Sequence, residues 1–265
     1  MKMGSSNDKD AVKAQYASSK SLDTRINFHN MYSTNKMGFG SWLISNYEIK
    51  EGMKVLELGT GTGDMWVGHD DLMAKCGTLV LSDFSEGMLE TARKNVGDHA
   101  NVEYKQIDVQ NIPFEDSSFD IIIANMMLYH VPDIHKAISE ISRVLKDDGV
   151  FYSATYGEHN FNDIIAEWFG LIGKNYDPNH LFTLQNGSDV LGKEFADIEV
   201  RRYEDSLHVT NIEDLADYLQ SLKALHGIGT MARDEILKML SLHEEKGSIN
   251  LQKEYGTFIA RKPIN

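Results

Sequence analysis

Three glycines at alternate positions, Gly59, Gly61 and Gly63, follow the apolar run 53–58. Glycine adopts positive φ angles easily, and it lets a ligand approach the backbone without meeting a Cβ atom. A glycine-rich turn between a strand and a helix therefore predicts a site for a nucleotide-like ligand. The alternative is an ordinary strand-to-helix turn, but such a turn does not need three glycines, each of which costs about 1 kcal/mol of chain entropy.

The spacing of these glycines differs from the dinucleotide fingerprint Gly-x-Gly-x-x-Gly. Counted from Gly59 the third glycine is replaced by Asp64, and counted from Gly61 it is replaced by Trp66. The loop and the segment after it carry several acidic residues and no Lys or Arg before Lys75. These surroundings repel a pyrophosphate but tolerate a sulfonium cation with an ammonium group. An NAD-dependent oxidoreductase is therefore the less favoured interpretation.

Two carboxylates end the next two predicted strands. Asp83 stands where a carboxylate can accept both hydroxyls of a ribose. Its alternative role is a helix N-cap, which Ser85 can fill instead. Asp108 is expected near an adenine amino group, with Val109 against the ring. Nucleotide-binding folds in general share this last pattern.

A histidine follows the fourth predicted strand. An unperturbed imidazole titrates near neutrality, so His130 is the candidate base for deprotonating a hydroxyl or an amine. The alternative is a histidine bonded to the backbone in the tight loop before Pro132. Tyr129 and Asn125 on the same loop are further candidates for contact with a substrate.

Four ring side chains can close over a cationic ligand or stack on its partner through cation–π contact, namely Tyr16, His29, Tyr32 and Trp66. Rings at helical spacing are more often core, so His29 and Tyr32 are interpreted as core. Tyr16 and Trp66 are predicted to be the exceptions.

Composition restricts the partners. The chain has 265 residues with 26 Lys plus Arg and 40 Asp plus Glu, and its net charge of -14 disfavours nucleic acid and anionic membranes. No apolar run is long enough to span a membrane and the start lacks a signal-peptide core, which predicts a cytoplasmic protein. The single Cys76 and the scattered histidines predict no metal site. We expect a monomer or homodimer acting on a small molecule.

Short apolar runs alternate with helical patterns, which predicts a doubly wound α/β fold with a parallel sheet. Strands are predicted at 53–58, 78–82, 102–107, 119–124, 149–155, 198–203 and 256–260, and helices at 64–74, 85–96, 133–145, 161–172, 181–195, 212–225 and 230–245. The predicted organisation is a disordered or tag-like stretch at 1–13, a helical N-terminal lid at 14–47, a binding core at 48–157, and cap helices with the last two strands at 158–265.

The ordered motifs VLELGTGTG, LSDFSEGMLETARKN, QIDVQNIPFEDSSFDIIIANMMLYHVPD and ISRVLKDDGVFYSATYG resemble those of class I S-adenosylmethionine (SAM)-dependent methyltransferases. The resemblance is to the group similar to ubiquinone/menaquinone-biosynthesis methyltransferases, and it covers about residues 50–157. It implies a Rossmann-like seven-stranded sheet of order 3-2-1-4-5-7-6 with an antiparallel seventh strand. The residues that it implies for SAM binding are Glu57, Gly59, Thr60, Gly61, Gly63, Asp83, Phe84, Met88, Asp108, Val109 and Asn125.

The expected function is methyl transfer from SAM to an O, N or C atom of a small molecule by in-line displacement, which yields S-adenosylhomocysteine. Tyr16 and Trp66 are expected to contact this donor, and His130 with Tyr129 to serve the acceptor. A non-catalytic SAM-binding regulator is the alternative from another class, because the residues argued most firmly bind the donor.

Overall fold

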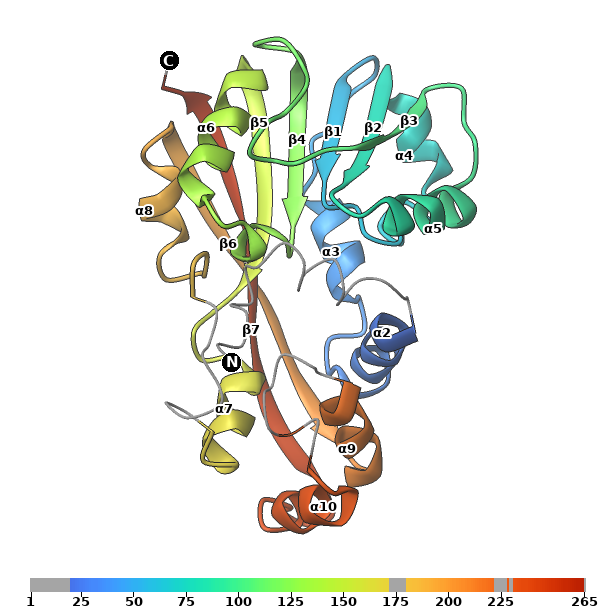
Figure 1. The fold of residues 1–265 in the computed structure, drawn as a ribbon, viewed down its shortest axis with the longest axis vertical. Helices are drawn as coiled ribbons and strands as arrows, with labels where there is room; N and C mark the ends of the chain where they lie inside the picture. Colours follow the sequence, from blue (N-terminus) through green and yellow to red (C-terminus); the bar gives the residue numbers. More distant parts are fainter. Residues whose placement is uncertain (1–19, 172–179, 222–227, 229–230, 265) are drawn as a thin grey trace, which may run out of the picture.

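Seven strands form one sheet in the computed structural model, which describes residues 20–171, 180–221, 228 and 231–264. The sheet order is β3-β2-β1-β4-β5-β7-β6 (Figure 1). The strands are β1 (Lys54–Leu58), β2 (Thr78–Asp83), β3 (Val102–Gln106), β4 (Phe119–Asn125), β5 (Leu145–Tyr156), β6 (Phe195–Val209) and β7 (Ile249–Pro263). β1 to β5 pair in parallel, and β7 pairs antiparallel with both β5 and β6. The predicted fold, strand order and antiparallel β7 are confirmed. The stretch 1–13 and Tyr16 lie outside the described residues.

The central strands bury both of their faces. Along β1, Val55 packs into one apolar cluster and Leu56 into another, and Ile121 and Ile122 of β4 divide in the same way. Burial on both faces explains why these strands are almost continuously apolar in the sequence rather than alternating.

Helices cover the sheet and extend past its carboxyl edge (Figure 1). They are α2 (Lys20–Tyr32), α3 (Phe39–Ser45), α4 (Asp70–Lys75), α5 (Glu86–Val96), α6 (Ile134–Val144), α7 (Phe161–Trp168), α8 (Gly187–Leu191), α9 (Ile212–Ser221) and α10 (Arg233–Ser241), with a 3-10 turn η1 (Leu128–His130). Ser85 caps α5 by accepting a hydrogen bond from the Met88 amide, and Asp133 caps α6 through the Lys136 amide. None of these helices is long and apolar enough to cross a membrane.

Two predicted helices are much shorter in the structure. The helix expected at 64–74 is reduced to α4, because turns occupy residues 64–68 and Gly68 adopts a φ of 77°. The helix expected at 181–195 is reduced to α8, because the chain before it bonds to the end of β5, where Leu184 donates its amide to the Tyr156 carbonyl. The helical pattern of the sequence is overridden by the positive φ of Gly68 in the first case and by hydrogen bonding to β5 in the second.

The last two strands are longer than the sequence pattern predicts. The upper part of β7 pairs with β5 as far as Tyr255, and β7 then continues beyond that strand in a two-stranded ribbon with β6 (Figure 1). The start of β5 also lies earlier than the predicted strand 149–155, since Leu145, predicted as the last residue of a helix, pairs with Phe119. Charged residues along these strands conceal their extent, because the apolar alternation is interrupted.

A third apolar cluster, separate from the two on the faces of the central strands, covers the extended ribbon. It joins side chains of α2, α7, α9 and α10 to the lower part of β6 and β7, including Phe28, Phe161, Leu207, Leu219 and Leu251. The helices inserted after β5 therefore pack on the ribbon beyond the carboxyl edge of the sheet (Figure 1).

A buried ion pair joins the ribbon to the arm, which we define as residues 33–38. Lys253 on β7 lies opposite Asp205 on β6, and its Nζ donates to Asp205 Oδ2 over 2.5 Å and to Ser33 Oγ over 3.0 Å. The Asn35 amide donates to Asp205 Oδ1 over 2.9 Å, and the Thr34 amide donates to the Ser206 carbonyl. The side chains of Lys253 and Asp205 are 2% and 0% exposed. These bonds fix the path of the arm across the ribbon.

Replacing Lys253 by methionine is expected to lower the free energy of unfolding by about 3–5 kcal/mol, because it leaves Asp205 buried without its ionic partner. The double change Asp205→Leu/Lys253→Met should recover much of that loss, since it removes both charges. Urea unfolding followed by circular dichroism measures the effect. Lys105→Met breaks an ion pair with Glu103 on the surface and serves as the control, with an expected loss below about 1 kcal/mol. A similarly small loss for Lys253→Met would contradict the assigned role.

Candidate active site

A cavity of about 630 Å³ lies at the carboxyl edge of the sheet, next to the arm, α2 and the ribbon. Small-molecule sites commonly have volumes of about 300–1,000 Å³. The predicted residues that line it are Gly59, Gly61, Asp83, Phe84, Met88, Asp108, Val109, Asn125, Tyr129 and His130. Those that do not line it are Glu57, Thr60, Gly63 and Trp66. Parallel strands thus bring together side chains that are far apart in the sequence.

The three loop glycines have positive φ angles of 73°, 58° and 77°, which side-chain-bearing residues rarely adopt. They are nevertheless required for different reasons. A Cβ at Gly59 would lie 2.9 Å from the side chain of Met127, and a Cβ at Gly63 would lie 2.8 Å from Val96 and 3.2 Å from the Ala92 backbone. A Cβ at Gly61 would meet nothing within 4 Å. Only Gly61 therefore presents bare backbone to open space, which refines the prediction of close ligand approach.

Glu57 holds the loop from below and is 2% exposed. Its Oε2 accepts hydrogen bonds from Thr60 Oγ1 over 2.6 Å and from Trp66 Nε1 over 2.7 Å. Burial raises the pKa of this carboxyl, and the two hydrogen bonds oppose that rise. Trp66 is 1% exposed and belongs to the core, so the expectation that it contacts the donor is not met in this structure. A tryptophan that satisfies a buried carboxylate cannot also close over a ligand.

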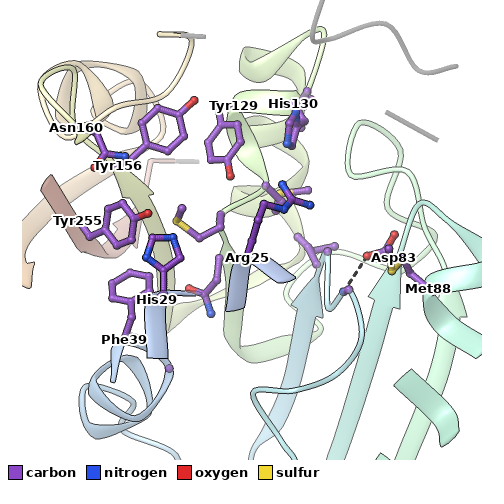
Figure 2. A pocket seen from close by; sticks show the side chains of 18 of the residues that line it. Arg25, His29, Phe39, Asp83, Met88, Tyr129, His130, Tyr156, Asn160 and Tyr255 are labelled. Atoms are coloured by element: carbon purple, nitrogen blue, oxygen red, sulfur yellow. Dashed lines mark hydrogen bonds between the residues drawn. The ribbon is translucent and has the colours of Figure 1, made fainter. Parts of the chain in front are cut away.

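Asp83 points from the end of β2 toward the loop (Figure 2). Its Oδ2 accepts from the Gly61 amide over 2.9 Å and its Oδ1 accepts from the Ser85 amide over 2.8 Å. Burial raises the pKa of Asp83, although bonds from the backbone amides of Ser85, Gly61 and Phe84 oppose the rise. Each carboxylate oxygen can accept more than one hydrogen bond. This fixed carboxylate on the cavity wall has the chemistry that a ribose diol requires.

Other residues of the cavity wall have the chemistry that the purine and amino-acid parts of the expected donor would require. Met88 and Val109 are buried apolar residues on the wall, next to Phe84, which is 36% exposed. At the end of β4, Asn125 donates through Nδ2 to the Tyr47 hydroxyl over 2.6 Å. Its Oδ1 is buried with no hydrogen-bond partner among the described residues. An orphaned buried acceptor in a cavity fits an ammonium donor such as that of a methionine moiety.

His130 and Tyr129 lie side by side on η1, with ring centroids 4.6 Å apart. The Tyr129 ring also packs at 4.7 Å on Tyr156, which ends β5. In the view of Figure 2 the Tyr129 ring lies beside Tyr156, and the His130 ring lies between Tyr129 and Asp83. The turn thus places an ionisable side chain on the wall of the cavity.

Sequence reasoning missed most of the wall that faces the donor residues. It is formed by Arg25, Phe39, Tyr156, Asn160, Tyr218, Lys253 and Tyr255, and it includes His29, which we had interpreted as core. These residues come from α2, α3, the end of β5, the position just before α7, α9 and β7. Of these elements, α2, α7 and α9 pack on the ribbon. The spacing of aromatic residues near the N-terminus indicated that rings such as His29 could matter for binding, but it did not distinguish rings that face the cavity from rings in the core. Tyr32, also interpreted as core, is buried and bonds to Asp214.

The sheet order and this constellation of side chains define the architecture of a class I SAM-dependent methyltransferase. Residues 56–153 match the family model described as a methyltransferase domain. The resemblance seen in the sequence motifs is therefore confirmed over this segment, which runs from β1 into β5. This segment is thus similar to a methyltransferase domain, while the arm and the ribbon lie outside the match.

The particular relatives agree with this class. The ubiquinone/menaquinone biosynthesis C-methyltransferase UbiE of Cronobacter sakazakii is 38% identical over 104 residues, which are 38% of this chain and 41% of that protein. The chain therefore spans less than half of this relative. Phosphoethanolamine N-methyltransferase 2 of Haemonchus contortus, solved with SAM, superposes with a TM-score of 0.61 at 19% identity, over 99% of this chain and 61% of that one. The YcgJ protein of Bacillus subtilis gives a TM-score of 0.59 at 20% identity, over 85% and 98%. These structural similarities establish the fold.

The loop glycines give a test that separates ligand approach from packing. Gly61→Ala places a methyl group in the open space before Asp83, so it should weaken SAM binding at least tenfold with a loss of stability of about 1 kcal/mol from the positive φ. Gly63→Ala adds a clash with α5 and should lower stability by clearly more. Calorimetric titration with SAM and thermal unfolding measure the two effects. Unchanged SAM affinity in a folded Gly61→Ala variant would contradict this assignment.

Proposed function

We propose that the protein is a SAM-dependent methyltransferase that transfers a methyl group to a small-molecule acceptor. The observation that carries the proposal is the shared cavity wall formed by the Gly61 backbone, Asp83 and Asn125, within or beside the segment that matches the methyltransferase-domain family. Bound SAM would supply a methyl group already activated for displacement by its sulfonium centre. The protein has to hold the donor, align the acceptor and exclude water.

Donor binding is assigned to residues of the sheet edge. Asp83 would accept the ribose hydroxyls, Met88 and Val109 would flank the adenine, and Asn125 Oδ1 would accept the ammonium group. Asp108, whose Oδ1 accepts from the amide and side chain of Gln110 over 3.0 Å, would face the adenine edge. Glu57, Thr60 and Gly63 would act through the shape of the loop, since they do not line the cavity.

Acceptor alignment is assigned to the opposite wall. Orienting two reactants within a closed site supplies several kcal/mol toward a displacement reaction. The tyrosines around Tyr255 would exclude water from that space. His130 would remove a proton where the acceptor has to lose one, with Tyr129 beside it. The inserted helices and the arm would act as the cap and lid of the site.

The space beyond the donor residues favours catalysis over regulation. A SAM-binding regulator without turnover needs no second compartment, whereas the cavity continues from Asp83 to Asn160 and Tyr255. An NAD-dependent oxidoreductase is disfavoured by the glycine spacing and by the acidic segment after the loop.

Asp83→Asn is expected to weaken SAM binding roughly 10- to 100-fold, because hydrogen bonds to a charged acceptor contribute about 1.5–3 kcal/mol. In the unchanged protein, SAM affinity should fall as the pH falls through the raised pKa of Asp83, since protonation removes an acceptor charge. The asparagine variant should lack this contribution to the pH dependence. Calorimetric titrations at several pH values test both statements. Asp71→Asn on the exposed start of α4 is the matched control, and equal affinity in both variants would refute the ribose role.

His130→Ala is expected to lower turnover about 100-fold while leaving the dissociation constant for SAM within twofold, because general-base catalysis commonly contributes at least that factor. The assay follows transfer of the labelled methyl group from SAM to acceptors in a metabolite extract. His135→Ala, on the exposed side of α6, is the control. Turnover that survives in His130→Ala would show that this imidazole is not the base. If SAM binds tightly and no labelled product forms in any extract, the catalytic proposal itself is contradicted.

A further inference from the structure

The wall opposite the donor residues forms a compartment that we call the aromatic chamber. It consists of His29, Phe39, Tyr129, Tyr156, Tyr218 and Tyr255, all of which line the cavity. Figure 2 shows the labelled rings of this set facing a common space on the side away from Asp83 and Met88. Phe39 packs at 5.2 Å on Tyr255, and Tyr129 at 4.7 Å on Tyr156. Such a set of rings suits a flat apolar body.

Charge is unevenly distributed along the cavity. Among the described residues that line it, the carboxylates are Asp83 and Asp108, and both belong to the donor side. The described lysines and arginine that line the cavity are Arg25 from α2, Lys36 from the arm and Lys253 from β7. The Lys253 ammonium already lies 4.9 Å from the centre of the Tyr255 ring and occupies that cation–π position. The charge of Lys253 is balanced by its buried partner Asp205. The chamber therefore offers a protonated amine no lining carboxylate, and Arg25 adds a like charge.

His29 is the chamber residue with unused hydrogen-bonding capacity. Its Nδ1 is buried and has no hydrogen-bond partner among the described residues. Edge-on contacts fix its ring at 5.4 Å from Phe161 and 5.5 Å from Tyr218. Buried polar atoms in folded proteins nearly always have partners, so this nitrogen calls for a ligand atom.

The imidazole of His29 is uncharged at physiological pH. Burial, together with the nearby charges of Lys253 and Arg25 and against the opposing effect of Asp205, lowers its pKa to about 3. A neutral imidazole offers one donor and one acceptor nitrogen, and it is too weak a base to remove a proton from an alcohol. His29 is therefore suited to orienting a ligand rather than to proton transfer.

A second unsatisfied atom belongs to the same neighbourhood. Asn162 lines the cavity, and its Oδ1 is buried without a partner among the described residues. Asn162 also bonds through its side chain to Tyr218, the ring that contacts His29. A hydroxyl can both donate and accept, and therefore matches a wall that offers an acceptor oxygen and an imidazole.

We propose that the aromatic chamber binds an uncharged, planar, hydroxyl-bearing acceptor, and that His29 determines this specificity by hydrogen bonding to the hydroxyl. This inference rests on the proposed methyl transfer but concerns binding and orientation of the acceptor. It assigns His29 to acceptor choice and leaves proton removal to His130. Protonated amines are disfavoured by the lack of a lining carboxylate in the chamber and by the charge of Arg25 rather than by the size of the chamber.

Three single-ring probes of similar size test the charge preference, namely p-cresol, benzylamine and benzoate. Ligand-observed NMR titrations measure their dissociation constants on the full-length protein, with and without saturating S-adenosylhomocysteine. p-Cresol is expected to bind at least tenfold more tightly than benzylamine and more tightly than benzoate. Tighter binding of either charged probe, or no binding of p-cresol, would overturn the inference.

Variants of His29 test the assigned contact. His29→Phe keeps a ring but removes both nitrogens, and it should weaken p-cresol binding roughly three- to tenfold, the equivalent of one neutral hydrogen bond. His29→Asn places an amide near the position of Nδ1 and should restore most of the affinity. Both variants should bind S-adenosylhomocysteine like the unchanged protein, which separates this role from a structural one. His208→Phe, on the exposed edge strand β6, is the control. Equal p-cresol binding by His29→Phe and His208→Phe would overturn the assignment.

The failure of this inference is distinguishable from failure of the proposed function. If S-adenosylhomocysteine and SAM do not bind, the proposed function fails, whatever p-cresol does. If SAM binds and its labelled methyl group moves only to amines, methyl transfer stands and the assignment of the chamber is wrong.

Discussion

The two-part cavity depends on the continuation of β7 beyond the end of β5. A strand that stopped at the sheet edge would complete the sheet and leave the donor residues facing solvent. The extra length pairs with β6, brings Lys253 against Asp205 and provides the surface on which α2, α7 and α9 pack. The arm is held to the same ribbon through Ser33 and Asn35. Backbone pairing and one buried ion pair thus create the wall that faces the donor residues.

Much of the donor side could be predicted from the sequence, because its parts are local. Each strand and the turn or carboxylate that follows it lie within one short segment of the sequence. Parallel pairing brings the carboxyl ends of these strands to one edge of the sheet, independently of the rest of the chain. For this reason the sequence indicates Gly61, Asp83, Val109 and Asn125 as neighbours, and all four line the cavity. Their contact with the donor remains a prediction. The strand order, which the resemblance of the motifs to class I methyltransferases implied, is confirmed. The predicted division of the chain into lid, core and cap remains a prediction.

The acceptor side could not be predicted in the same way. Its geometry depends on the pairing of Asp205 with Lys253, which are 48 residues apart in the sequence. Charged residues along the ribbon also interrupt the alternation of apolar and polar residues by which its strands could be predicted. Trp66 illustrates a different difficulty. Its aromatic ring suggested contact with a cation, but the indole nitrogen satisfies Glu57 in the core. A side chain with both an apolar ring and a donor fits either environment, and only the buried carboxylate decides between them.

The contact between Gly59 and Met127 links the two sides of the cavity. The missing Cβ of Gly59 lets Met127, on the loop that leads into η1, pack directly against the donor loop, and both residues line the cavity. A ligand that displaces one loop must therefore disturb the other. Through such a shared wall, occupation of one compartment changes the free energy of filling its neighbour, and the effect is reciprocal. The two ligands can in this way strengthen or weaken each other's binding without any moving domain.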